Sequence, residues 1–556
     1  MIKHLPLIVL FLLSAACVQA QNTVGLLSYN PSKAFDGYNM IYPHNQPNVY
    51  LLDNCGEIVH VWEDDSNWRP GNTAYLLENG NLVKTKRDGN VSNDAIWAGG
   101  GGAIIEIRSW DNDLLWYFEL NDATNRLHHD IEVMPNGNIL AIVWELKTDA
   151  EAIQAGRDPN NLPDSELWPD YVIEIEPVGT NDYNIVWEWH AWDHLIQDFD
   201  ATKDNYGVVA DNPGKIDINY TPDGVADWFH TNAISFHPNR NQIVLSVPTF
   251  DEIWILDHTT TTAEAAGNTG GNSGKGGQFM YRFGNPRAYD MGTEDDQLLY
   301  YQHDIHWALD FLDISHPFYD KMIVFNNRVG EDYSTANAFD APWDMYNWEY
   351  TLTNGVYGPT SFSDVQEHPI DPTLMYSTGL SSIQHLPNGN TLICVGRFGY
   401  MFEITPTDQI VWEYKTPLNA GVPATQGDTL LVNNNLTFRV KRYPTTFAAF
   451  DGKDLSSQGW IESEPDEDFC QTILPTLEAF KEYKMDVYPN PGSDVITLEW
   501  EGMPNSLIEV FDLSGRRMHA MEASGGRKYL NVSGWENGMY IIRVDGKGVR
   551  TLVVNH

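Results

Sequence analysis

Short runs of alternating apolar and polar residues, separated by polar turns, dominate the chain from Leu51 onward. Alternation with a period of two residues is the pattern of half-buried strands. Four runs have the form of a hairpin in which an apolar strand and a polar turn are followed by a strand carrying Trp: LLDNCGEIVHVWE (51–63), EIRSWDNDLLWYFE (106–119), YVIEIEPVGTNDYNIVWEW (171–189) and YMFEITPTDQIVWEY (400–414).

Further runs lie between these hairpins, and in each an Asn-Gly or similar turn precedes a β-branched strand: YLLENGNLVKT, EVMPNGNILAIVWE, ISFHPNRNQIVLSV and IQHLPNGNTLICVG. A hairpin together with such a run has about the size of one four-stranded blade. The pattern therefore predicts an all-β chain whose main part, residues 21–450, is a β-propeller of about six blades.

Few segments have helical periodicity. WHAWDHL (189–195) is typical of a short helix or a loop, as are residues 474–484. Residues 259–277 are rich in Thr, Ala and Gly and are expected to form an insertion at the border of a cleft. The GNSGKG sequence within them fails as a phosphate loop, because Thr269 replaces the first Gly of that motif and Gly276 replaces its final Ser or Thr.

The N-terminus has the features of a secretory signal. Lys3 precedes an apolar run (5–13), and small residues lead to a cleavage site after Ala20, so residues 1–20 are expected to be removed. The alternative is a lipoprotein signal cleaved before Cys17. No other apolar run approaches the ~20 residues that a transmembrane helix needs. The sequence therefore predicts export without a transmembrane segment.

Charge and cysteine content narrow the classes of partner. The 556-residue chain has 77 acidic and 33 basic residues, a formal net charge of −44, and the acidic residues are spread along its length. Such a surface disfavours nucleic acid and anionic membranes, which both need basic patches. In an oxidising compartment, Cys55, Cys394 and Cys470 allow one disulfide and leave one cysteine free; the sequence leaves the pairing open.

The alternating pattern ends after Tyr443. Residues 451–482 are acidic and are expected to be a linker, and residues 483–556 contain short strands that predict a small β-sandwich. The motifs YPNP (488–491), DLSGRR (512–517) and GMYIIRV (538–544) resemble the C-terminal sorting domain of proteins exported by the Bacteroidetes type IX secretion system. This resemblance implies a secreted or cell-surface protein that passes the periplasm and the outer membrane with the type IX machinery as partner.

Four histidines are candidates for chemistry. His128 and His129 lie in LHHDIEVMPNGN, His230 in DWFHTN and His303 in QHDIHW. Imidazole suits proton transfer and nucleophilic attack near neutral pH, so these histidines indicate a reaction centre. Zinc ligation together with Asp130 and Asp304 is the alternative, but no histidine pair has a tight ligand spacing such as HExxH, and no metal site is predicted.

Over residues 24–445 the chain resembles the bacterial arylsulfate sulfotransferase family. The resemblance depends on several motifs in one order: LHHDIEVMPNGN, DWFHTNAISFHP, EIWILDH with TTTAEAAG, YRFGNPRAY, QHDIHW and LPNGNTLICVGRFGYMFEIT. It implies a six-bladed propeller enzyme that moves a sulfuryl group from a phenolic sulfate ester to a phenol through a sulfohistidine, with no cofactor.

The same resemblance implies roles for particular residues. His303 is expected to be the nucleophile, His129, or alternatively His128, the acid/base, and His230 a further contact of the sulfuryl group. The expected substrate-binding residues are His128, Asn232 and Arg282.

One position departs from the family pattern. Pro248 stands eighteen residues after His230, where the family places an Arg that binds the sulfuryl oxygens. Proline offers no side-chain donor and no backbone N–H. Another cation, Arg282, Arg287, Lys275 or Arg397, can take this role; otherwise the chain is a catalytically silent or altered propeller used for extracellular binding.

Overall fold

A computed structural model describes residues 22–221, 225–470, 485–500, 505–512, 516–524, 527–544 and 548–556. The chain divides into two compact units, Met1–Asp466 and Glu467–His556. The expected signal peptide and residues 474–484 lie outside the described residues. Among the residues that are described, no helix combines the length and the apolar character needed to cross a bilayer.

Six antiparallel sheets of four or five strands make up most of the described part of the first unit. The first three are β35 (Thr437–Pro444) with β2 (Gly37–Pro43), β3 (Val49–Leu52) and β4 (Ile58–Trp62); β5 (Trp68–Leu76), β6 (Leu82–Asp88), β7 (Ile104–Arg108) and β8 (Leu114–Glu119); and β9 (Asn125–Val133), β10 (Ile139–Glu145), β13 (Asp170–Val178) and β14 (Asp182–His190).

The other three are β17 (Ala233–His237), β18 (Gln242–Val247), β19 (Glu252–Asp257) and β20 (Tyr281–Phe283); β21 (His303–Trp307), β22 (Met322–Asn326), β23 (Thr335–Phe339) and β28 (Asp364–Gln366); and β29 (Ser382–His385), β30 (Thr391–Val395), β31 (Tyr400–Ile404) and β32 (Ile410–Lys415) with β1 (Gly25–Tyr29). The prediction of an all-β chain is confirmed.

Short elements fill the connections. The two-stranded ribbons are β11 (Lys147–Thr148) with β12 (Glu166–Leu167), β15 (Leu195–Ile196) with β16 (Ile216–Asp217), β24 (Trp343–Asp344) with β25 (Glu349–Tyr350), β26 (Leu352–Thr353) with β27 (Val356–Tyr357), and β33 (Leu418–Asn419) with β34 (Val422–Pro423). In the described part of the first unit, the helices are α1 (Asp149–Ala155), α2 (Thr262–Ala265) and the 3-10 turns η1 (Pro159–Asn161), η2 (Ala191–His194), η3 (Val209–Asp211), η4 (Pro286–Tyr289), η5 (Glu294–Asp296), η6 (Pro372–Met375), η7 (Gly396–Phe398) and η8 (Ala448–Phe450).

The four predicted hairpins are confirmed as antiparallel pairs, namely β3–β4, β7–β8, β13–β14 and β31–β32. WHAWDHL forms the end of β14, the turn η2 and the first residue of β15. The insertion at 259–277 contains the short helix α2, which begins with a capping box between Thr261 and Glu264.

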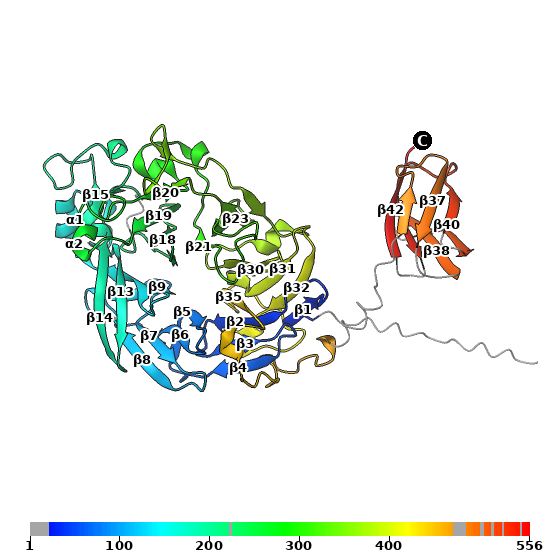
Figure 1. Ribbon diagram of the computed structural model, residues 1–556, viewed down its shortest axis with the longest axis horizontal. Helices are drawn as coiled ribbons and strands as arrows, with labels where there is room; N and C mark the ends of the chain where they lie inside the picture. Colours follow the sequence, from blue (N-terminus) through cyan, green and yellow to red (C-terminus); the bar gives the residue numbers. More distant parts are fainter. Residues whose placement is uncertain are drawn as a thin grey trace, which may run out of the picture. The chain divides into compact units, whose positions relative to one another are not determined.

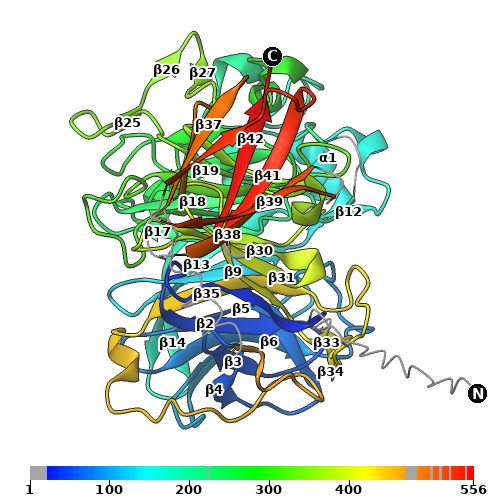
Figure 2. The same cartoon turned by 90° about the vertical axis from the view of Figure 1, so that its right-hand side faces the viewer.

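The sheets lie around a common centre, and each turns its edge strand toward it (Figure 1). Strand β5 contacts β9 and β35, β9 contacts β17, β17 contacts β21, β21 contacts β29, and β29 contacts β35. Both views place β35, β2, β3 and β4 in this order across one sheet, with β5 of the next sheet alongside (Figures 1 and 2).

Tryptophan indoles connect one sheet to the next. Trp62 donates its Nε1–H to the carbonyl of Ser109, Trp116 to that of Asp182, Trp189 to that of Gly277, and Trp412 to that of Asn54. Each of these Trp residues is buried on the second strand of its hairpin, namely β4, β8, β14 or β32. Its acceptor lies in the part of the chain that forms the next sheet or, for Trp412, the first sheet. The recurrent Trp therefore serves the packing between sheets, because a buried indole needs an acceptor for its N–H.

The two ends of the first unit pair with each other. Strand β1 pairs with β32, and β35 pairs with β2. At this junction the guanidinium of Arg442 forms a fully buried ion pair with Glu403 on β31 and donates to Asn39 Oδ1 on β2 at 2.7 Å. Residues within the range expected as a linker also lie against this unit, since Gln458 donates to the carbonyl of Val59 and Ser463 to that of Ala424.

The second unit contains two antiparallel sheets. They are β36 (Met485–Tyr488), β37 (Val495–Trp500) and β40 (Arg527–Asn531), and β39 (Arg517–Ser524), β38 (Asn505–Asp512), β41 (Gly538–Val544) and β42 (Gly548–Val554). Both sheets contribute to one buried core that includes Ile496, Leu498, Val510, Ile542 and Leu552.

The cysteines fall into two chemical states. Cys55 and Cys470 are disulfide-bonded, and Cys394 is a free, buried thiol.

We expect Arg442→Met to lower the free energy of unfolding by about 3–5 kcal/mol, because it leaves Glu403 charged and buried without its partner. Urea unfolding followed by tryptophan fluorescence measures this change. The matched control, Lys321→Met, breaks the partly exposed ion pair with Asp340 and should cost no more than about 1 kcal/mol. Equal effects of the two variants would contradict the role given to Arg442.

Candidate functional site

Three of the predicted histidines meet at the centre of the first unit. The Nε2 atoms of His129 and His230 are 3.0 Å apart, and the ring centres of His129 and His303 are 6.4 Å apart. His129 lies on β9, His230 in the segment before β17, and His303 at the start of β21. These three side chains are called the histidine cluster below.

Irregular backbone turns the histidines inward. The register of β9 against β10 and of β21 against β22 shifts at the segments that carry His129 and His303, as in β-bulges. His129, His230 and Asp304 have φ values of 53°, 51° and 60°, in the left-handed region that non-glycine residues seldom adopt. Such conformations cluster at functional sites, where the surrounding structure offsets their cost.

Gly100 leaves the space that His129 occupies. A Cβ at this position would lie 2.2 Å from His129 Nε2, and Gly100 itself has a φ of +84°. Its carbonyl accepts the backbone N–H of His129. Only glycine fits here, because both the space and the backbone conformation exclude a side chain.

His303 is held in one tautomer. Its Nδ1 lies 2.8 Å from Asn327 Oδ1, and the amide group of Asn327 is oriented by donation from Nδ2 to the carbonyls of Ser377 and Leu380. Asn327 Oδ1 must therefore accept, which places the proton of His303 on Nδ1 and the lone pair on Nε2. Burial lowers the pKa of His303 to about 3. Near neutral pH the ring is an uncharged imidazole with a free Nε2 lone pair.

His230 is the basic member of the cluster. Its Nδ1 bonds to Asp227 at 2.5 Å, and Asp227 also accepts the indole N–H of Trp144. Burial alone would lower the pKa of His230, but the Asp227 carboxylate outweighs burial and raises it above the ordinary value. The pKa of Asp227 falls despite its burial, because His230 and Trp144 stabilise the anion.

His129 connects to His230 as its uncharged partner. Burial, together with the nearby His230, lowers the pKa of His129 well below the ordinary value. Asn72 Nδ2 lies 2.9 Å from His129 Nδ1 and donates to it, so the proton of neutral His129 is on Nε2 and points at His230 Nε2. These contacts form a continuous chain of hydrogen bonds from Asn72 through His129 and His230 to Asp227.

The other predicted site residues have different positions. His128 stacks on Trp144 and bonds to Asp170 at 3.1 Å, with its ring centre 6.3 Å from that of His230. Asn232 is fully buried and donates to the carbonyl of Gln302, the residue before His303.

Arg282 lies outside the group. Its guanidinium forms a fully buried ion pair with Glu252 and donates to the carbonyl of Lys215 at 2.8 Å. These contacts engage it away from the histidine cluster, although the sequence motif had suggested a substrate contact.

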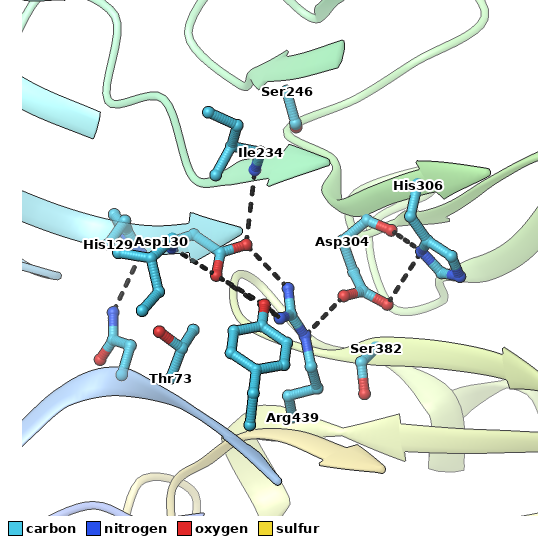
Figure 3. A network of polar contacts seen from close by, with 12 residues as sticks. Thr73, His129, Asp130, Ile234, Ser246, Asp304, His306, Ser382 and Arg439 are labelled. Carbon is cyan, nitrogen blue, oxygen red and sulfur yellow. Dashed lines mark hydrogen bonds and ion pairs between the residues drawn. The ribbon is translucent and has the colours of Figure 1, made fainter. Parts of the chain in front are cut away.

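Arg439 joins the strands beneath the cluster (Figure 3). It pairs with Asp130 at 2.9 Å and with Asp304 at 2.8 Å, and it bonds to the hydroxyl of Tyr75. Asp130 and Asp304 directly follow His129 and His303, so these pairs fix the strand segments that hold both imidazoles. The two carboxylates and the Tyr75 hydroxyl raise the pKa of Arg439 well above its usual range, although desolvation acts in the opposite direction.

Arg397 approaches His303 from another side, and Arg328 lies against the neighbouring Tyr301. A Cβ on Gly379 would be 3.6 Å from both Arg397 Nη2 and His303 Cε1, so the two side chains flank this glycine. Within the described residues, Arg397 bonds through Nη1 to Asn433, while its buried Nε has no partner. Arg328 lies against the ring of Tyr301 at 3.7 Å. At position 248 the structure has a buried proline after β18, with no donor directed at the cluster.

Sequence reasoning did not identify Asp227, Asn327, Asn72 or Arg439 as parts of the site. Asp227 could have been found, because it precedes His230 by three residues in DWFH. The other three come from distant segments with no motif of their own. In the described part of the chain, no group of three His, Cys, Asp or Glu side chains is placed to hold a metal ion.

We expect the histidines to titrate differently in NMR spectra of ring-labelled protein. The resonance of His303 should keep its neutral position between pH 5 and pH 8, because its pKa lies near 3. His230 should gain its proton with a midpoint above 6.5, and Asp227→Asn should move that midpoint below 6.5. A midpoint for His303 inside this pH range would contradict the assignment of its tautomer and environment.

Solved structures offer distant similarity. A protein of unknown function from Bacteroides caccae has 10% identity and a TM-score of 0.35, over 68% of this chain and 94% of that chain. A catalytically inactive variant of virginiamycin B lyase from Staphylococcus aureus has 11% identity and a TM-score of 0.29, over 69% and 86% of the two chains. No curated protein matches the chain.

Two family models match. Residues 486–555 match the secretion system C-terminal sorting domain, as the sequence motifs predicted. This domain implies type IX secretion and indicates a location at the cell surface or in the extracellular space. Residues 30–418, more than half of the chain, match the arylsulfotransferase (ASST) model. The chain therefore belongs to the arylsulfotransferase family.

Proposed function

We propose that this protein is a secreted aryl sulfotransferase that transfers a sulfuryl group from a phenolic sulfate ester to a phenol through a sulfohistidine at His303. The observation that carries the proposal is the tautomer of His303. Asn327 holds the ring proton on Nδ1, so Nε2 presents a lone pair next to two further histidines. A neutral imidazole with a free nitrogen is a nucleophile that needs no prior deprotonation.

The first unit is proposed to be a six-bladed β-propeller. The support is the row of contacts from β5 through β9, β17, β21, β29 and β35 back to β5. The indole hydrogen bonds between successive sheets and the pairing of β35 with β2 agree with this arrangement. In such a fold the edge strands surround one axis, and bulges on two of them direct the histidines toward it.

In the first step, His303 Nε2 attacks the sulfur of the ester. The new N–S bond forms as the S–O bond to the phenolate breaks, and the aryl oxygen leaves in line with the attacking nitrogen. The step needs no oxidant or cofactor, because the electron pair of Nε2 replaces the pair that leaves with the phenolate.

His230 is proposed to handle the proton. Protonation of His230 on Nε2 ends its hydrogen bond from His129 Nε2 and frees that N–H. The imidazolium of His230 then gives its Nε2 proton to the departing phenolate, and the neutral ring removes a proton from the acceptor phenol. The acceptor oxygen attacks the sulfur, the N–S bond breaks, and His303 returns to its starting state. Asp227 suits His230 to this role since it stabilises the charged ring. The family resemblance assigned this role to His129, whose lowered pKa makes it the weaker base.

The sulfuryl oxygens need donors that Pro248 does not provide. Arg397 is proposed to take the place of the missing Arg, because its side chain flanks Gly379 together with His303 and its Nε has no partner among the described residues. His129 adds an N–H from the opposite side. A preorganised charged donor of this kind contributes about 3 kcal/mol to the stabilisation of a transition state.

The decisive experiment gives the purified mature protein p-nitrophenyl sulfate and phenol without any nucleotide. We expect release of p-nitrophenol with formation of phenyl sulfate, and loss of at least about 1,000-fold in His303→Ala because the nucleophile is gone. His519→Ala, in the second unit, is the matched control. If the parent protein shows no transfer above background, the result favours the alternative suggested by Pro248, a catalytically silent propeller used for extracellular binding.

We expect Arg397→Gln to lower kcat/KM by roughly 100-fold, since it removes a charged donor to the sulfuryl oxygens. Arg287→Gln is the control, because Arg287 is engaged with Asn285 and Gln297. Introducing the family residue as Pro248→Arg should raise turnover and partly rescue Arg397→Gln. Equal rates for Arg397→Gln and the parent would show that the compensating cation is elsewhere.

A further inference from the structure

A second site lies on the other side of Arg439 from the histidine cluster. It is a cavity of about 320 Å³ to which all six edge strands β5, β9, β17, β21, β29 and β35 contribute. None of the three clustered histidines lines it. Along β9 its lining begins at Glu132, three residues after His129, and along β21 it begins at Asp304, the residue after His303. We call it the inner-strand cavity. Its size falls at the lower end of the range for small-molecule sites.

The wall of this cavity combines polar groups with an apolar part. Leu77, Val133, Phe236, Leu309 and Leu312 line it together with the aromatic rings of Trp307 and Tyr443. Such a wall accommodates an alkyl or aryl body, and aromatic faces also attract a cation.

Two polar groups that face the cavity have unused acceptor capacity, while Trp307 in the same lining has a buried indole N–H without a partner among the described residues. Within the described residues the carboxylate of Glu132 has no hydrogen bond or ion pair. His306 Nδ1 lies 2.8 Å from the carbonyl oxygen of Asp304, which can only accept, so Nδ1 carries the proton and Nε2 keeps a lone pair. A ligand that satisfies both groups must therefore bring donors.

The charges around the cavity favour a cation. Asp310 pairs with Lys441 on β35, and Asp304 shares Arg439 with Asp130. Asp310 and Lys441 neutralise each other, whereas the single positive charge of Arg439 is shared by two carboxylates, Asp130 and Asp304. Glu132 adds a further acidic group that has no ion pair among the described residues. The chain as a whole also has a net charge of −44, which repels anions.

We propose that the inner-strand cavity binds a small organic cation, a primary ammonium on an apolar or aromatic body, with Glu132 as its counter-ion and His306 Nε2 as a hydrogen-bond acceptor. The ammonium group supplies the three donors that these acceptors lack, and the apolar body contacts the ring of Leu, Phe and Trp side chains. The site is separate from the histidine cluster, and the proposal does not depend on the sulfotransferase activity.

Calorimetric titration of the mature protein tests the site with three probes of one shape: 2-phenylethylamine, 2-phenylethanol and 3-phenylpropionate. These probes have neither a phenolic hydroxyl nor a sulfate ester, so they are not substrates of the proposed transfer. We expect the amine to bind at least 10-fold more tightly than the alcohol, and the carboxylate to bind more weakly than both. Equal binding of amine and alcohol, or no binding of the amine, would overturn the proposal.

Variants locate the bound amine. Glu132→Gln should weaken amine binding at least 10-fold while leaving binding of the alcohol and the rate of sulfuryl transfer unchanged. Glu119→Gln, at an exposed position on β8, and His303→Ala should bind the amine as the parent does. Amine affinity that survives in Glu132→Gln, or that disappears in His303→Ala, would place the ligand elsewhere and overturn the proposal.

The affinity should also depend on pH in a defined direction. Burial and the neighbouring Asp310 raise the pKa of Glu132 to about 8, against the opposing effect of Lys441. Lys441 and Arg439 stay charged, because nearby carboxylates raise their pKa values, and burial keeps His385 neutral by lowering its pKa to about 3. Amine binding should therefore strengthen from pH 6.5 to pH 8.5 as Glu132 ionises. A flat profile in the parent, or the same slope in Glu132→Gln, would contradict the role of Glu132.

Discussion

The ion pairs of the partly buried Arg439 guanidinium are the contacts on which the centre of the first unit depends. Removing such a cation from water costs several kcal/mol unless anions surround it. Asp130 from β9, Asp304 from β21 and the hydroxyl of Tyr75 from β5 meet this requirement. Each Asp directly follows a histidine, so the pairing fixes the direction of His129 and His303. Arg439 itself belongs to β35, which pairs with β2, and the site is therefore complete only when distant parts of the chain have come together.

The two sides of Arg439 have opposite electrostatic character. On one side the histidine cluster, Arg397 and Arg328 offer N–H groups and cations, although the protein as a whole is strongly acidic. This local excess suits an anionic sulfate ester. On the other side, Glu132 and His306 offer acceptors within a cavity whose wall is partly apolar. One salt-bridged arginine thus separates a region suited to anions from a region suited to cations.

Burial and hydrogen bonding divide the chemistry among similar imidazoles. His129 and His303 are buried and His230 is partly buried, yet only His230 has a carboxylate on its ring nitrogen, and its pKa is raised. The amide oxygen of Asn327 accepts from Nδ1 of His303 without charging the ring, which leaves a lone pair on Nε2, whereas the amide N–H of Asn72 donates to Nδ1 of His129 and leaves the proton on Nε2. The group on Nδ1, an amide oxygen, an amide N–H or a carboxylate, thus sets the tautomer or the charge of each ring.

The sequence alone determined the strand pattern, the four hairpins and the sorting domain, because alternation and turn residues act over a few neighbouring positions. It also identified His129, His230 and His303, since each lies in a local motif. The tertiary structure decided what these residues meet. Asn327 and Arg439 lie far from the histidines in sequence and carry no motif, and Arg282 has a suggestive motif but is bound to Glu252. Ion pairing and amide orientation depend on which distant strands become neighbours, and the local sequence pattern does not predict which strands these are.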